Sequence, residues 1–281
     1  MAVKEVKLST IEEVLTTLTT AEFNDALKRN RSAFLFRGLP NVSYKLTTSL
    51  RWNCKEKAGE LEPSILRNFS KYAASTSPLN SCWEQMVIGQ HHGLPTRLMD
   101  WTYSPLAALH FATSGEDITG MNQHDAVVWA IDITEMNTLL PAKYQKVLND
   151  ERAYLFTIDM QNAYEQLGLI IGETIEDDIV DKNLTTYDND MGEDGIVLLE
   201  PPSIDQRIIN QYSYFSIIPS GVEDIEQFLD EKTTRTVKYI LDKEIRWQIR
   251  DMLDQCNVNE RTIYPGLDGL ASWIKRHYYV R

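Results

Sequence analysis

The sequence predicts an α+β protein, with a mixed, mostly antiparallel sheet, an N-terminal and an inserted helical layer, and helices at the C-terminus. Three observations lead to this fold class. Apolar residues recur at helical spacing early in the chain, short apolar runs typical of strands dominate the middle, and helical spacing returns at the end. With no internal repeat and no low-complexity linker, the 281 residues predict a single domain. We divide it into an N-terminal helix (1–32), a core (33–218) and a C-terminal strand with helices (219–281).

Capping signals place six helices in the sequence. The first, over 10–30, begins at Thr10, which together with Glu13 has the form of a capping box. A helix over 81–92 begins with the same pattern and ends before Gly93. The other four are a helix opened by Glu62-Pro63, one over 106–113 after the cap Ser104, and two C-terminal helices over 243–256 and 267–278.

Runs rich in β-branched and aromatic residues predict five strands, at 33–36, 126–131, 196–199, 212–218 and 237–241. The first strand is predicted to end at Arg37-Gly38, and a loop through Pro40 follows. Two further segments lack periodicity. We interpret 96–102 as a polar elbow between two helices, and the acid-rich stretch 173–194 as an exposed excursion.

Composition excludes several classes of protein. The net charge of −13 and pI near 4.9 oppose general nucleic-acid binding, which depends on Lys and Arg displacing counterions. The chain has no apolar stretch of the roughly 20 residues that span a bilayer, so no membrane contact is predicted. Three widely spaced cysteines and an N-terminus without signal-peptide features favour a reducing cytoplasm. The three cysteines are too far apart in the sequence to indicate a thiolate metal site. The adjacent histidines His91 and His92 are poorly spaced to bind one metal ion, so no metal is predicted.

A candidate site centres on the polar run from Gln90 to Thr102. Gln, His, Thr, Arg, Asp and Trp are concentrated there between two apolar helices. An unpaired buried polar group costs about 1–3 kcal/mol, so a purely structural loop rarely carries so many. We expect the site to include Arg37 from an early strand and Gln211 from a late strand. The predicted catalytic residues are Arg37, Glu84, His91 and Gln211, and the predicted binding residues are Gln90, Thr96, Arg97, Asp100, Trp101 and Thr102.

Several of these residues also have an ordinary structural explanation. Arg37 can clamp a phosphate or carboxylate in bidentate fashion, or pin its strand to a helix through a salt bridge. Glu84 can face the site, but the capping box of its helix explains it fully. His91 is the histidine expected to point inward, because His92 beside it points about 100° away on a helix.

The predicted elbow leaves similar alternatives open. Arg97 and Asp100 can form an ion pair that shapes the loop. Trp101 can stack on a purine or nicotinamide ring as a pocket wall, or anchor the core between helices. The hydroxyls of Thr96 and Thr102 can bind phosphate beside the next helix N-terminus, or serve only as turn and cap residues.

Three pieces of the chain form a recognisable pattern. They are Phe36-Arg37-Gly38, then Trp83-Glu84 leading into Gln90–Thr102 and Ser104-Pro105-Leu106, and finally Arg207-Ile208 with Gln211 and Phe215. Together they resemble the FRG-domain family, named for a (Phe/Tyr)-Arg-Gly motif. The resemblance covers most of the chain from Phe34 onward, and its long second motif is the specific one. This sequence departs from the family pattern at Met99, where a second Leu is usual, and at Tyr212-Ser213, where Gln-Gly is frequent.

Two functions follow as hypotheses. The order of parts is similar to that of ADP-ribosyltransferases, which implies a nucleotide-like ligand, with NAD as substrate rather than as a permanently bound cofactor. In that superfamily a late-strand glutamate supports an oxocarbenium-like transition state, and Gln211, the best positional match, lacks the charge. The alternative is a non-catalytic binding or regulatory module, in phage–host conflict or signalling, that recognises a nucleotide-like molecule or a protein target in the same pocket.

Overall fold

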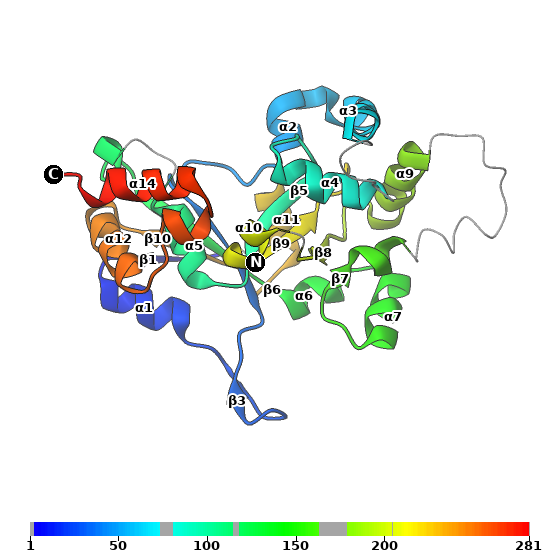
Figure 1. The fold of residues 1–281 in the computed structure, drawn as a ribbon. Helices are drawn as coiled ribbons and strands as arrows, with labels where there is room; N and C mark the ends of the chain where they lie inside the picture. Colours follow the sequence, from blue (N-terminus) through cyan, green and yellow to red (C-terminus); the bar gives the residue numbers. More distant parts are fainter. Residues whose placement is uncertain (1–2, 74–80, 115–117, 163–178, 204, 281) are drawn as a thin grey trace.

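An eight-stranded sheet runs through the middle of the molecule, with the strand order β1-β10-β6-β4-β5-β9-β8-β7 (Figure 1). The computed structural model describes residues 3–73, 81–114, 118–162, 179–203 and 205–280. β1 pairs in parallel with β10, and β7 with β8; the other neighbours are antiparallel. The predicted α+β class with a mixed, mostly antiparallel sheet is therefore confirmed. The strands are β1 (Lys4–Leu8), β4 (Phe34–Leu39), β5 (Leu98–Thr102), β6 (Ala126–Asp132), β7 (Phe156–Thr157), β8 (Val197–Glu200), β9 (Ser213–Ile217) and β10 (Val237–Leu241).

The sheet is split between its two central strands. β4 pairs with β6 along six residues, but in the described part of the chain its ladder with β5 is the single pair Phe36–Thr102. Beyond that pair the two strands diverge, which leaves the backbone groups of β5 on this side without ladder partners. Such groups need other donors and acceptors, so the split is a natural place for polar side chains.

Helices cover the sheet in groups that belong to its two halves (Figure 1). α1, α5 and α12 enclose one cluster of buried apolar residues with β4, β6 and β10, and α3, α4, α7 and α9 enclose another with β5, β8 and β9. The helices of four or more residues are α1 (Ile11–Thr19), α2 (Ser49–Cys54), α3 (Ala58–Ala73), α4 (Cys82–His91), α5 (Pro105–Ala112), α6 (Ile133–Thr138), α7 (Ala142–Glu151), α9 (Ile179–Met191), α10 (Gln206–Gln211), α11 (Ile225–Lys232), α12 (Arg246–Gln255), α13 (Glu260–Ile263) and α14 (Leu267–His277).

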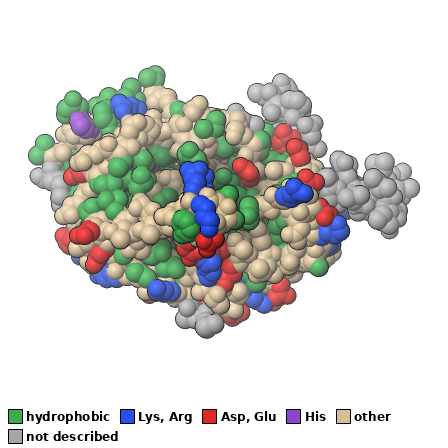
Figure 2. Space-filling model, turned by 90° about the horizontal axis from the view of Figure 1, so that it is seen from below, with side chains coloured by type: hydrophobic (Ala, Val, Ile, Leu, Met, Phe, Trp, Pro, Cys, Tyr) green, Lys and Arg blue, Asp and Glu red, His purple; other side chains and the backbone are tan. Residues whose placement is uncertain are grey.

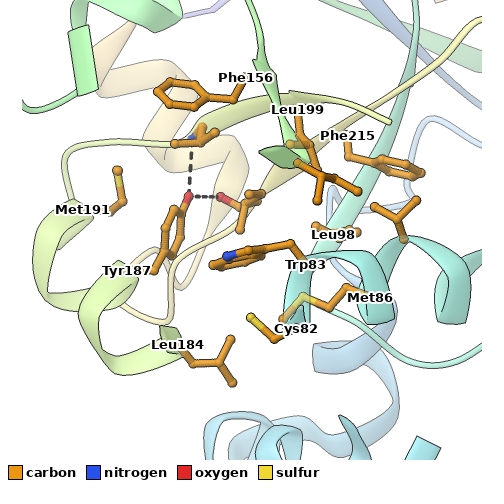
Figure 3. Close-up of a cluster of buried hydrophobic side chains, with 14 of the residues drawn as sticks. Cys82, Trp83, Met86, Leu98, Phe156, Leu184, Tyr187, Met191, Leu199 and Phe215 are labelled. Carbon is orange, nitrogen blue, oxygen red and sulfur yellow. Dashed lines mark hydrogen bonds between the residues drawn. The ribbon is translucent and has the colours of Figure 1, made fainter. Parts of the chain in front are cut away.

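Tyr187 of α9 joins the second cluster to the sheet (Figure 3). Its ring meets the indole of Trp83 from α4 edge-on, with 5.3 Å between centroids. Its hydroxyl donates to the carbonyl of Ile217 at 2.7 Å and accepts the amide of Val197 at 3.3 Å. A buried phenol with both hydrogen-bonding functions used fixes α9 over the β8–β9 pair.

The close approach of α5 to β4 depends on Gly38. A Cβ at this position would lie 1.9 Å from the carbonyl oxygen of Ala108 and 2.6 Å from the amide nitrogen of Ala112. The backbone of α5 therefore touches β4 where a side chain would otherwise stand. The glycine of the Phe-Arg-Gly motif serves helix–strand packing.

The predicted helix over 10–30 is wrong in its second half. The capping box of Thr10 and Glu13 is present, but α1 ends at Thr19. The hydroxyls of Thr19 and Thr20 donate back to carbonyls four residues earlier, and a hairpin of β2 (Phe23–Asn24) and β3 (Arg29–Asn30) follows. Threonine hydroxyls that compete for helix carbonyls weaken the helical choice, and the apolar spacing alone did not show this.

The hairpin projects from the body of the molecule, and its apolar side chains have no core to enter (Figure 1). Phe23 is 58% exposed and Leu27 57%. In the view from below, where the hairpin points toward the viewer, Lys and Arg side chains gather in the middle of the face (Figure 2). The expected N-terminal helix over 1–32 is thus a strand, a short helix and this hairpin.

Two further predictions need correction. The segment 96–102 is largely the buried strand β5 rather than an elbow, because the pleat of the strand directs Leu98 into one apolar cluster and Met99 and Trp101 into another. In the acid-rich segment 173–194, residues up to 178 lie outside the described part, but 179–191 form α9, which buries Leu184 and Met191.

The other predicted elements are present with shifted ends. α3 begins at Ala58, so Pro63 lies inside the helix rather than at its start. α4 and α5 have their predicted caps, since the Ser81 hydroxyl accepts from the amide of Glu84 and that of Ser104 from Ala107. Within the described residues, no helix combines the length and the apolar character that crossing a membrane requires.

A buried charge network ties α5 to the C-terminal helices. His110 of α5 is fully buried, and its Nδ1 lies 2.9 Å from a guanidinium nitrogen of Arg250. Arg250 and Arg276 share the carboxylate of Glu260, and Arg276 also binds Asp254. Burial, and next the charges of Arg250 and Arg276, hold the pKa of His110 well below its ordinary value. The imidazole is therefore neutral in the folded protein at neutral pH.

This depressed pKa predicts acid sensitivity. As pH falls below 6.5, the unfolded chain takes up a proton at His110 that the folded protein refuses, so stability falls, by at most about 1.4 kcal/mol per pH unit from this group. Urea unfolding at several pH values between 7.5 and 5.0 measures the slope. His110→Asn, whose amide oxygen can replace Nδ1 as acceptor, is expected to flatten it; His92→Gln, at an exposed histidine, is expected to leave it unchanged. An equal slope in the wild type and His110→Asn would contradict the assignment.

Candidate functional site

A cavity of about 340 Å³ lies at the split between β4 and β5. α2 and the two residues before it form one wall, the C-terminal end of α4 and the turn after it form another, and the two strands form the floor. Three of the residues singled out from the sequence meet here: Arg37, Gln90 and Asp100. The cavity is lined by Arg37, Thr47, Thr48, Ser49, Trp52, Gln90, Gly93, Leu94, Leu98, Met99 and Asp100.

Arg37 bridges the split. One terminal nitrogen of its guanidinium donates to the backbone carbonyl of Asp100 at 2.6 Å and lies 3.7 Å from the Asp100 carboxylate. Its Nε is buried and has no hydrogen-bond partner. Burial lowers the pKa of Arg37, and the charge of Asp100 opposes this shift. The guanidinium thus stays charged while part of its donor capacity is unused.

The polar wall opposite Arg37 is held by Thr96, which is fully buried. The backbone amide of Thr96 donates to the hydroxyl of Ser49 at 3.1 Å, and the carbonyl of Thr96 accepts from the backbone amide of Leu50 at 3.1 Å. The hydroxyl of Thr96 donates to the side-chain oxygen of Gln90. Since that oxygen is engaged, the amide group of Gln90 has its NH₂ left to donate to a ligand in the cavity.

Trp52 stands at the mouth of the cavity. Its side chain is 71% exposed, and the ammonium group of Lys55 lies 4.3 Å from the centre of its ring. An exposed indole with a cation over it offers a face on which a planar ring can stack. Trp52 lies within α2 and is not among the site residues predicted from the sequence.

Arg97 lies apart from this cavity's surface, in a buried group of charges. It contacts the carboxylate of Glu62 through Nε at 2.9 Å, and that of Asp188 through a terminal nitrogen at 2.6 Å. Burial lowers the pKa of Arg97, but the charges of Glu62 and then Asp188 outweigh it and raise the pKa above its ordinary value. Arg97 does not form the ion pair with Asp100 that the sequence left open as an alternative, since Asp100 faces Arg37. A larger cavity of about 740 Å³, on the other side of α2, reaches this group.

The structure places three other predicted residues in structural contacts. Trp101 is buried in the core, and its indole nitrogen donates to the hydroxyl of Ser216 at 2.9 Å. The hydroxyl of Thr102 donates to the carbonyl of Gln211 at 2.6 Å. We expected Gln211 on a late strand, but it is the last residue of α10. Its side-chain amide donates to the carbonyl of Ile263 at 3.2 Å. Tyr212 follows α10 with a left-handed backbone conformation, and β9 begins at the next residue, Ser213.

Glu84 and His91 point elsewhere along α4. Glu84 stands in the first turn, where its amide donates to the Ser81 cap, and it does not line the Arg37 cavity. His91 lines a second cavity, with its Nε2 3.2 Å from the carboxylate of Asp205. Neighbouring residues of one helix turn, Gln90 and His91, thus face two different cavities.

Among the described residues, no group of three or more His, Cys, Asp or Glu side chains is arranged to hold a metal ion.

Three comparisons with known proteins bear on the family to which the chain is related. No curated protein matches the chain, and no solved structure does. A family model, that of the FRG domain, matches residues 32–119, which include β4, α2, α3, α4, β5 and α5. Residues 32–119, which carry most of the lining of the Arg37 cavity, are therefore an FRG domain.

Proposed function

We propose that this FRG-domain protein binds a nucleotide-like anion in the Arg37 cavity. The observation that carries the proposal is the guanidinium of Arg37, which is held at the split with a buried Nε that has no partner. Arginine is the side chain best suited to bind a phosphate in bidentate fashion, and here its Nε donor is unused.

The rest of the cavity suits the other parts of a nucleotide. Asp100 has a carboxylate that is 60% exposed beside Arg37, where it can accept hydrogen bonds from ribose hydroxyls. Trp52 offers a stacking face for a base, and Gln90 offers donors between the two. An anion, a diol and a planar ring in this order match a nucleotide better than a simple carboxylate or sugar.

NAD is the nucleotide we place first, because the family resemblance implies it. Asp100 is then the carboxylate available to stabilise an oxocarbenium-like centre on the ribose, the role for which Gln211 lacks the charge. Release of nicotinamide would assign NAD cleavage, and a mass increment on a protein target would assign ADP-ribosyl transfer. Tight binding without product would assign the regulatory module. The proposal places the protein in the cytoplasm, in phage–host conflict or signalling.

Arg37→Lys is expected to weaken the binding of AMP, ADP-ribose and NAD at least about tenfold, because lysine cannot present two parallel donors. Isothermal titration of the full chain with each ligand measures the change. Arg67→Lys, at an exposed arginine of α3, is the matched control and is expected to bind like the wild type. Absence of binding in the wild type, or equal affinities in wild type and Arg37→Lys, would refute the proposal.

A further inference from the structure

A second cavity of about 340 Å³ lies close to the first. α4 contributes His91, the start of α10 contributes Asp205 and Arg207, and the turn into α14 contributes Tyr264 and Asp268. Two observations connect it to the Arg37 cavity. Gln90 and His91, one after the other on α4, line the first and the second cavity. Asp100, in the first, lies close enough to act electrostatically on Tyr264 in the second.

The lining of the second cavity favours a positively charged group, whereas a phosphate site favours a negatively charged one. Asp205 and Asp268 line it, and Arg207 is the one permanent cation among its lining residues. Asp205 also uses one oxygen to accept from the amide of Arg207 at 2.6 Å, and the other faces His91. Asp268 is exposed in the first turn of α14 and adds its full charge to the cavity.

An aromatic ring completes the lining. The guanidinium of Arg207 lies 5.3 Å from the centre of the Tyr264 ring, which is the geometry of a cation–π contact. Burial raises the pKa of Tyr264; the charge of Arg207 opposes this shift, and the charges of Glu260 and Asp100 add to it. The phenol therefore stays neutral and keeps an electron-rich ring beside several carboxylates.

We propose that the second cavity binds a positively charged planar group, such as a pyridinium or guanidinium, next to the anion held by Arg37. The inference rests on the proposed function, because it assumes that an anionic ligand occupies the first cavity. A ligand that occupies both cavities would therefore have an anionic part and a cationic part. Oxidised NAD has both in one molecule, while a basic side chain of a target protein supplies the cation separately.

Oxidised and reduced NAD test this directly, since they differ in the charge of the nicotinamide ring. We expect the wild type to bind the oxidised form more tightly, and we define the preference as the ratio of the two dissociation constants. Asp268→Asn is expected to reduce this preference about threefold, and Arg207→Gln, which removes the competing cation, to increase it by a similar factor. Opposite shifts from two variants of one cavity are not what a structural disturbance produces.

The control addresses the overall charge of the protein. Because the chain carries a net charge of −13, it repels the reduced form more than the oxidised form everywhere on its surface. Asp251→Asn removes the same charge at an exposed position of α12, and it is expected to leave the preference unchanged. Equal preferences in Asp268→Asn and Asp251→Asn, or shifts of the same sign in Asp268→Asn and Arg207→Gln, would overturn the inference.

A second arm identifies the source of the cation. Nα-acetyl-arginine amide is titrated into the protein saturated with ADP-ribose. Binding that Asp268→Asn weakens and Asp251→Asn does not, together with no preference for oxidised NAD, assigns a basic side chain. No binding of the amide together with no preference for oxidised NAD overturns the inference. Failure of the proposed function is recognised separately, because then ADP-ribose itself does not bind or its binding ignores Arg37→Lys.

Discussion

Arg97→Met is expected to lower the free energy of unfolding by about 3–5 kcal/mol, because it leaves the carboxylate of Glu62 buried without its cation. The side chain of Glu62 is 1% exposed and that of Arg97 is 6% exposed. Three donor–acceptor contacts join the two, and Asp188 from α9 completes the group. The loss therefore affects α3, α9 and the start of β5 together. Urea unfolding followed by circular dichroism measures it.

The same group predicts a rescue. If the cost comes from an unpaired buried charge, Arg97→Met combined with Glu62→Leu should be more stable than Arg97→Met alone, because an apolar pair of similar volume can replace a buried ion pair. The control is Lys146→Met, which breaks an exposed pair with Asp150 on α7 and should cost less than about 1 kcal/mol. A double variant as unstable as Arg97→Met would show that the charge of Glu62 is not the cause.

Local signals were enough to predict six of the helices and five of the strands. The caps at Thr10, Ser81 and Ser104 each satisfy amide groups within three residues, so the sequence alone contains both partners. Strands such as β6, buried along its whole length, are recognisable as uninterrupted apolar runs. Tertiary contacts were not needed for either.

What the sequence could not show depends on partners far along the chain. Asp188 lies 91 positions from Arg97, so the sequence offered only Asp100 as a nearby partner, an alternative that the structure does not adopt. The split between β4 and β5, which creates the cavity, is a matter of sheet register and leaves no local trace. Arg207 belongs to a segment with a family-like pattern, but nothing in that pattern indicates that it shares a cavity with Tyr264 and His91.

The polar run from Gln90 to Thr102 therefore has two uses. Gln90 and Asp100 line the Arg37 cavity, whereas Thr96 holds one of its walls and Arg97 pairs with Glu62 and Asp188 away from it. The concentration of buried polar residues predicted a ligand site, but the structure pairs Thr96, Arg97, Trp101 and Thr102 with groups of the protein. The sequence could not separate partners supplied by the protein from those left for a ligand.

Gly38→Ala is the second large effect, and we expect it to cost about 3 kcal/mol or more. The added methyl group would stand 1.9 Å from the carbonyl oxygen of Ala108, and the atoms it meets are backbone atoms of α5 rather than the end of a flexible side chain. Relief requires α5 to move off β4, and overpacking of a rigid contact typically costs 1–3 kcal/mol, occasionally more. Because Arg37 is the preceding residue, the same movement is expected to weaken nucleotide binding.

Gly59→Ala is the matched control, since it makes the same chemical change where there is room. Gly59 lies in α3, and no atom stands within 4 Å of the added Cβ. Alanine favours a helix over glycine by roughly 1 kcal/mol, so this variant should be as stable as the wild type or more stable. Opposite signs from the two substitutions would show that the glycine of the Phe-Arg-Gly motif is required by the contact of α5 with β4. A stable Gly38→Ala that binds like the wild type would show instead that α5 can retreat from β4 without disturbing Arg37.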